Sequence, residues 1–119
     1  MKIYSFGFKY QEGQPEAYLT FDLRNKLKNP VSHLPKGAIG LDRIVIDTVL
    51  GTDQNKKIFE TIFVKIRKLM KERGEDISVS FGCTSGIHRS VVFAEELHRR
   101  MLKAKVSSTL QHVHLKPRE

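Results

Sequence analysis

Apolar residues alternate with small or polar residues in two stretches near the start of the chain. This period of two predicts strands over residues 2–8 and 17–23, separated by a turn that contains a glycine and a proline at 13–15. Residues 24–41 hold two prolines and two glycines and show no sustained periodicity. We therefore expect a long ordered loop there, a feature that is usually functional in a compact domain.

A helical period follows in the middle of the chain. Residues 42–50 predict a short helix with Asp42 as its N-cap. Between residues 54 and 73 apolar side chains recur every three or four positions, which predicts an amphipathic helix that ends at Gly74.

The last third of the chain predicts a strand, a helix and a strand. An apolar strand over 77–81 leads through a short polar loop into a helix that ends near residue 103, and 106–113 form the last strand. This order predicts an α/β fold: one domain, 1–119, with a mixed, mostly parallel sheet of about four strands flanked by helices. We expect a right-handed crossover between the last two strands and a ligand at the carboxyl edge of the sheet.

Composition narrows the class of protein. Of 119 residues, 39% are hydrophobic and 29% are charged, which is typical of a soluble globular domain. No apolar run is long enough for a membrane span, and a single cysteine cannot form an internal disulfide. We expect a cytoplasmic protein without a membrane partner, a metal or a cofactor.

The net charge is +8, from 21 basic and 13 acidic residues. A field of this sign attracts nucleic acid, phosphorylated metabolites or an acidic protein, although a solvated basic surface without a partner is equally compatible with it. The basic residues gather after the second strand (Arg24, Lys26, Lys28), in the long helix at 65–73, and at 98–105.

Cys83, Gly86, Arg89 and Ser90 have the spacing C-x-x-G-x-x-R-S, which is the motif of cysteine-dependent phosphatases. In such an enzyme a thiolate attacks phosphorus, an arginine forks onto two phosphate oxygens, a glycine lets the loop curl, and a hydroxyl assists the sulfur. The same arrangement of strand, glycine-bearing loop and helix start also binds anions without chemistry. Thr84, Ser85 and His88 add two hydroxyls and a group that becomes cationic near physiological pH.

Two features count against catalysis. Gly82 stands where the phosphatase motif usually has histidine, and no acidic residue lies in a recognisable general-acid loop. Structural roles also stay open at this stage: a lone cysteine is often a buried small hydrophobe, and Arg89 could pair with Glu95, Glu96 or Asp42.

Six segments give a more specific indication. They are Ser5-Phe-Gly-Phe-Lys9, Phe21-Asp-Leu-Arg24, Asn29-Pro30, Gly40-Leu-Asp42, Gly82-Cys-Thr-Ser-Gly-Ile-His-Arg-Ser90 and Val92-Phe-Ala-Glu-Glu-Leu97. In this order they resemble the C-terminal domain of the RapZ family of RNase adapter proteins, over about residues 4–115. The resemblance implies a non-catalytic α/β domain similar to a phosphofructokinase subdomain. It also implies binding of small regulatory RNA, sensing of glucosamine 6-phosphate, and self-association into oligomers.

The resemblance assigns residues to the ligand site. The matching anion-binding positions are Cys83, Thr84, Ser85, Gly86, Ile87, His88, Arg89, Ser90, Arg24, Asn29 and Asp42, and Asp22 matches a position toward the same pocket. For RNA we expect Arg24, Lys26, Lys28, Arg99, Arg100, Lys103 and His112.

The chain departs from the family pattern in four places. Ser85 replaces a glycine, Val31-Ser32 replaces a histidine or aromatic pair with His33 displaced, and Gln111-His112-Val113 replaces Arg-His-Arg. No G-x-x-x-x-G-K-S/T string of the adapters' N-terminal nucleotide-binding domain occurs. We therefore expect a stand-alone regulatory module that binds a phosphorylated amino sugar, RNA phosphates or both, with a phosphatase using Cys83, Arg89 and Ser90 as the alternative.

Overall fold

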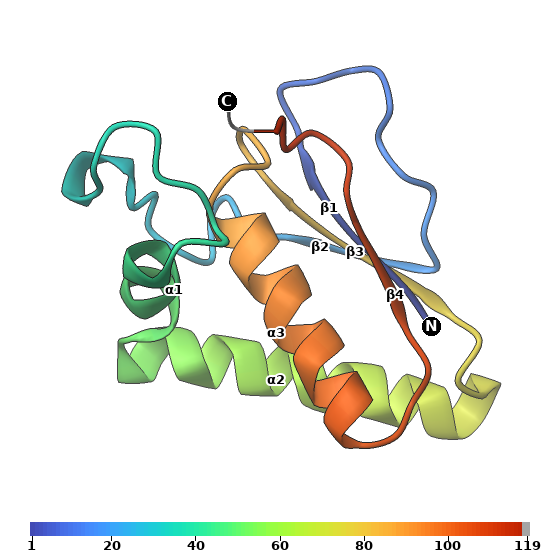
Figure 1. Cartoon of the computed structure of the whole chain (residues 1–119). Helices are drawn as coiled ribbons and strands as arrows, with labels where there is room; N and C mark the ends of the chain where they lie inside the picture. The colour runs from blue at the N-terminus through green and yellow to red at the C-terminus, as the bar shows by residue number, and fades with distance from the viewer. Residues whose placement is uncertain (118–119) are drawn as a thin grey trace.

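The computed structural model describes residues 1–117 and contains a four-stranded sheet (Figure 1). The strands lie in the order β2-β3-β1-β4, and every pair of neighbours is parallel. Their bounds are Lys2–Gly7 for β1, Leu19–Asp22 for β2, Ser78–Cys83 for β3 and Thr109–His112 for β4. The α/β fold is confirmed, and the sheet is wholly parallel among the described strands rather than mixed.

The helices follow the predicted pattern closely. They are α1 (Arg43–Leu50), α2 (Asp53–Arg73) and α3 (Arg89–Lys103), and a 3₁₀ turn, η1 (Val31–His33), lies in the long loop. No helix within the described residues has both the length and the apolar composition needed to cross a bilayer.

Strand β3 continues two residues further than its apolar pattern predicts. Gly82 pairs on both sides, opposite Phe6 and Asp22, and Cys83 pairs on one side, opposite Gly7. Pairing with two neighbours therefore carries β3 through the glycine at which its hydrophobic pattern stops.

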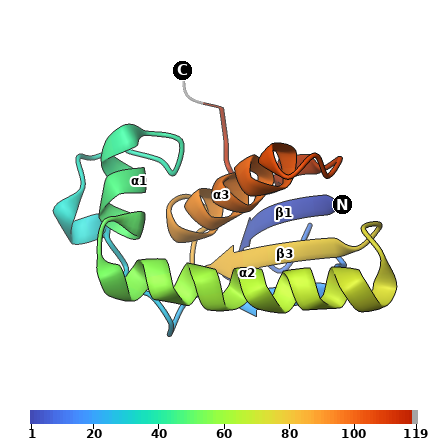
Figure 2. The same ribbon diagram turned by 90° about the horizontal axis from the view of Figure 1, so that it is seen from below.

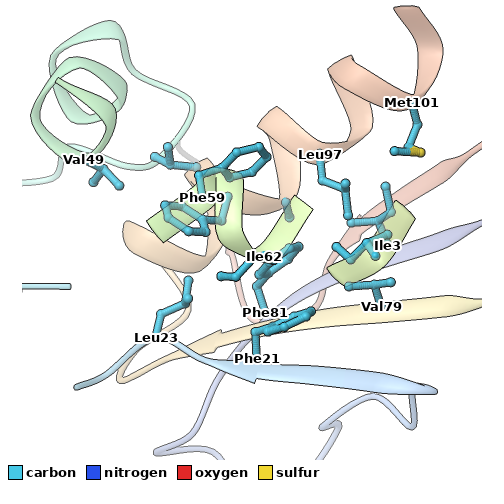
Figure 3. Packing of buried hydrophobic residues seen from close by; sticks show 14 of the residues in the cluster. Ile3, Phe21, Leu23, Val49, Phe59, Ile62, Val79, Phe81, Leu97 and Met101 are labelled. Carbon is cyan, nitrogen blue, oxygen red and sulfur yellow. The ribbon is translucent and has the colours of Figure 1, made fainter. Parts of the chain in front are cut away.

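Helices α2 and α3 pack against one face of the sheet, with α3 crossing the strands and α2 running beneath it in Figures 1 and 2. One aromatic cluster joins the three elements: Phe93 of α3 meets Phe59 of α2 edge to face at 5.2 Å and Phe81 of β3 at 6.0 Å. Figure 3 shows Phe59, Phe81 and Phe21 in this core, all buried. Burial of each such ring contributes about 2–3 kcal/mol.

The opposite face is covered by the connection between β1 and β2. A side chain alternates faces along a strand, so Phe6 points away from the helices. Its ring lies 4.7 Å from that of Phe8, and both rings occupy the space where a Cβ on Gly82 would stand. The right-handed rule explains this layering, because β1 to β2 moves across the sheet in the direction opposite to β3 to β4.

Helix α3 ends in a Schellman motif. The backbone N–H of Val106 donates to the carbonyl of Met101, and that of Lys105 donates to the carbonyl of Leu102. Lys105 adopts φ +61°, the left-handed region that glycine usually occupies.

We predict that Lys105→Gly raises the free energy of unfolding by about 1 kcal/mol, because the left-handed conformation penalises a side chain. Urea denaturation measures this change in the free energy of unfolding, provided that the dependence on urea concentration has the same slope in the variant and the wild type. The control is Lys103→Gly in the last helical turn, which should lower stability by about 0.5–1 kcal/mol. Equal effects of the two substitutions would contradict this assignment of strain.

Candidate functional site

The loop between β3 and α3, residues 84–88, lies directly on the end of β1 at the carboxyl edge of the sheet. Gly86 has φ +74°, and a Cβ on it would lie 2.7 Å from the backbone nitrogen of Gly7. A Cβ on Gly7 would in turn lie 2.5 Å from the carbonyl carbon of Ser85. Glycine is thus required on both sides of this backbone contact.

The carbonyls of the loop accept backbone hydrogen bonds, whereas its amides do not donate any within the described part of the chain. The carbonyls of Cys83 and Thr84 accept from Phe8 and Lys9, and that of Ile87 accepts from Gly40. Among residues 1–117 the backbone N–H groups of 85–88 have no acceptor. These amides lie where α3 begins, so the helix dipole adds to their attraction for an anion.

Cys83 lies beneath the loop, with 2% of its surface exposed. Its Sγ and the Oγ of Ser90 are hydrogen-bonded at 3.1 Å, and the backbone N–H of Ser90 points at the same sulfur from 3.5 Å. The thiol therefore faces the start of α3 and not the solvent.

Arg89 is also buried, and its guanidinium binds backbone. One nitrogen donates to the carbonyls of Arg24 at 3.2 Å and Leu27 at 3.0 Å, and the other donates to the Thr84 hydroxyl at 3.4 Å. None of the carboxylates considered from the sequence pairs with it among the described residues. Arg89 thus ties the turn after β2 to the β3–α3 loop.

His88 likewise binds backbone, in the second half of the long loop. Its Nε2 donates to the carbonyl of Ala38 at 2.8 Å, next to the bond from Gly40 N–H to the carbonyl of Ile87. Asp42 closes the segment by accepting from the backbone N–H of Ile39 at 2.9 Å. Asp42 is the N-cap residue of α1 as predicted, but its carboxylate binds this upstream amide and makes no side-chain cap bond.

The end of β2 contributes an exposed cation beside the loop. Arg24 forms a bidentate pair with Asp22, at 3.0 and 2.7 Å, and its guanidinium lies 3.9 Å over the ring of Phe8. The hydrogen bond from Arg24 holds the pKa of the Asp22 carboxyl below its usual value, and the charge of Arg89 adds to the effect.

The structure therefore gathers most of the predicted anion-binding residues at one edge. Residues 83–90, Arg24 and Asp42 lie around it, whereas the Asn29 side chain accepts from the backbone N–H of Val31 in its own turn. Sequence reasoning missed the contributions of Gly7 and Phe8. Both belong to the Ser5–Lys9 string, whose glycine between two aromatic residues was the available signal.

The predicted RNA-binding residues fall into two separate groups. Arg24, Lys26 and Lys28 follow β2 at the carboxyl edge, whereas Arg99, Arg100 and Lys103 lie in the second half of α3.

Arg99 and Arg100 of the second group, and His112 of β4, form hydrogen bonds or ion pairs with other residues of the domain. Arg99 pairs with Glu96 at 2.7 Å, and Arg100 pairs with Glu60 while lying over two phenylalanine rings. His112 bridges the Ser5 hydroxyl at 2.6 Å and the Glu95 carboxylate at 2.9 Å.

Comparison with known proteins gives one consistent result. A family model described as the RapZ C-terminal domain matches residues 1–116. A "Nucleotide-binding protein" of Nitratidesulfovibrio vulgaris is 40% identical over 97% of this chain and 39% of its own length. Proteins of the same name from Ruminiclostridium cellulolyticum and Fervidobacterium nodosum are 34% and 39% identical over 94% and 92% of this chain.

The chain spans about two-fifths of the length of these curated relatives, 39% to 40%. The part that matches carries the open amides, the paired glycines and the C-x-x-G-x-x-R-S loop described above. On the match of the family model over nearly every residue, this chain belongs to the RapZ C-terminal domain family.

Proposed function

We propose that this domain is a non-catalytic regulatory module that binds a phosphorylated small molecule at the β3–α3 loop. The observation that carries the proposal is the run of backbone N–H groups at 85–88, which have no acceptor among residues 1–117. Unsatisfied amides at a helix start favour a ligand with several anionic oxygens.

The side chains around the loop suit a phosphate group. The hydroxyls of Thr84 and Ser85 supply further donors, and Arg24 supplies an exposed guanidinium whose partner Asp22 fixes its orientation. Arg89 acts as a positioning residue in this proposal, because its nitrogens hold the carbonyls that shape the pocket wall.

Within this proposal the ligand is an amino-sugar phosphate similar to glucosamine 6-phosphate, as the family resemblance implies. Its phosphate would occupy the amides at 85–88. Its ammonium group would lie toward the acidic side of the same edge, where Asp22 and Asp42 stand. Carboxylates beside an anion loop suit a ligand that carries both charges.

Burial of Cys83 supports a binding role over the phosphatase alternative. A cysteine nucleophile must reach the phosphorus atom, whereas this thiol has 2% of its surface exposed and is hydrogen-bonded to Ser90. Its arginine is likewise bound to two backbone carbonyls rather than open toward a substrate.

Two further properties belong to the proposal because the family resemblance implies them: contact with RNA and self-association. Leu41 and Ile44 are about half exposed, at 47% and 48%, at the start of α1. Exposed apolar side chains of this size suit contact with a second copy of the domain.

We expect the isolated domain to self-associate. Light scattering coupled to gel filtration should give a mass above the 13.7 kDa of one chain. The double substitution Leu41→Ser/Ile44→Ser should lower that mass, because it removes the exposed apolar contact. A monomeric wild-type domain would reject this part of the proposal.

We predict that Arg24→Gln weakens binding of glucosamine 6-phosphate about tenfold, because a hydrogen bond to a charged group contributes about 1.5–3 kcal/mol. Isothermal titration calorimetry measures the dissociation constant. Arg43→Gln is the matched control, since Arg43 is also exposed and paired with a nearby aspartate, Asp47, but lies in α1. Equal losses in the two variants would argue against the loop as the site.

We predict that neither the wild-type protein nor Cys83→Ser hydrolyses para-nitrophenyl phosphate under reducing conditions. Cys83→Ser should nevertheless keep its affinity for the sugar phosphate, because the open amides do not depend on the sulfur. Release of para-nitrophenol is followed by absorbance. Turnover that disappears in Cys83→Ser would establish the phosphatase in place of the binding module.

A further inference from the structure

Two hollows on the molecule join into one groove between α2 and the turn after β2. One, of about 360 Å³, lies between residues 26–33 and the start of α2; the other, of about 330 Å³, runs along α2 itself. They share Lys26 and Gln54, so they adjoin each other. Figure 1 shows the segment after β2 on the same side of the molecule as α1 and the beginning of α2. We call this surface the α2 groove.

The lining of the α2 groove is basic and free of carboxylates. Lys26, Lys28, Lys57 and Lys65 line it together with His33, and neither hollow is lined by aspartate or glutamate. All four lysines are exposed, and none has an ion-pair partner within residues 1–117. By contrast, Arg24, Arg43, Arg99 and Arg100 are each paired with a carboxylate.

The acidic side chains nearest to the groove are Asp53 and Glu60 of α2. They line the next hollow along the helix, which shares Lys57 and Thr61 with the groove, and Glu60 also pairs with Arg100 of α3. The lining of the groove itself is nevertheless net positive, and charges that face solvent attract a polyanion over about one Debye length, near 10 Å.

We propose that the α2 groove binds the sugar-phosphate backbone of single-stranded RNA without sequence preference. Lysines are depleted from protein–protein interfaces, where arginine, tyrosine, tryptophan and phenylalanine are enriched, and this groove is lined by lysine with none of those four residues. His33 is the one ring in the lining on which a base could stack, so most of the contact falls to the lysines and the phosphates. Neutral donors such as Asn29 and Gln54 suit phosphate and ribose oxygens.

This inference rests on the RNA contact within the proposed function, but not on the sugar-phosphate site at residues 84–88. It places the RNA-binding surface away from Arg99, Arg100 and His112, whose side chains already pair with carboxylates of this domain. It retains Lys26 and Lys28 from the sequence prediction and adds Lys57 and Lys65.

The test compares two charge-matched double variants. Lys57→Gln/Lys65→Gln removes two groove lysines, and Lys2→Gln/Lys71→Gln removes two exposed lysines that do not line the groove. The probe is a fluorescein-labelled uridine homopolymer of about 20 nucleotides, longer than the site sizes of about 4–16 nucleotides usual for single-strand grooves. Fluorescence anisotropy gives the dissociation constant at several salt concentrations.

We expect the groove variant to bind the homopolymer about tenfold more weakly at low salt. Its plot of log affinity against log salt should be shallower by about 1.4, since each phosphate contact to a single strand contributes about 0.7 to the slope. The control variant should stay close to the wild type, and both should keep their affinity for glucosamine 6-phosphate.

Other results overturn the inference in separate ways. Equal losses in the two variants, or no loss in the groove variant, reject the α2 groove and leave the proposed function standing. Competition by polyglutamate as strong as competition by unlabelled RNA rejects nucleic acid as the partner in favour of an acidic protein. Failure of the wild-type protein to bind the homopolymer at low salt rejects both the groove and the RNA contact. Titration with glucosamine 6-phosphate then tests the remaining part of the proposed function, the sugar-phosphate site at residues 84–88.

Discussion

The contact between the backbone of β1 and the backbone of the β3–α3 loop is the constraint on which the candidate site depends. Gly7 and Gly86 meet so closely that a Cβ on either would overlap the other segment. Carbonyls of the loop bond to Phe8 and Lys9, while the amides at 85–88, at the start of α3, have no acceptor among residues 1–117. Two glycines distant in sequence thus shape the proposed anion site by allowing two backbones to touch.

A second set of contacts joins the long segment 24–41 to this loop. The guanidinium of Arg89 and the imidazole of His88 both donate to backbone carbonyls in that segment. Burial of a charged guanidinium is costly unless its donors are satisfied, so the carbonyls of Arg24 and Leu27 stabilise Arg89 while Arg89 fixes their turn. The side of the site that would contact the sugar and the groove beside α2 therefore depend on the same residue.

The motif C-x-x-G-x-x-R-S suggested the candidate site from sequence but did not give the structural roles of its members. Its spacing predicted Cys83 and Arg89 as groups open to a phosphate, and both are buried with partners inside the domain. The partners of Arg89 and His88 are main-chain carbonyls, which every residue carries. Since such partners have no sequence identity, no spacing rule could have distinguished an arginine that binds phosphate from one that holds a turn.

Hydrophobic periodicity by itself determined the strands, the helices and their buried faces, because a local period of two or 3.6 decides which side chains can be covered together. Membership of the family also followed from short strings such as Ser5–Lys9 and Gly82–Ser90. The tertiary structure alone decided the strand order and which cations keep their charge. Arg100 is paired with Glu60, 40 residues away, while Lys57 and Lys65 on the same helix as Glu60 have no ion-pair partner within residues 1–117. Ion pairing depends on distances of a few ångströms across the fold, and composition contains no such distances.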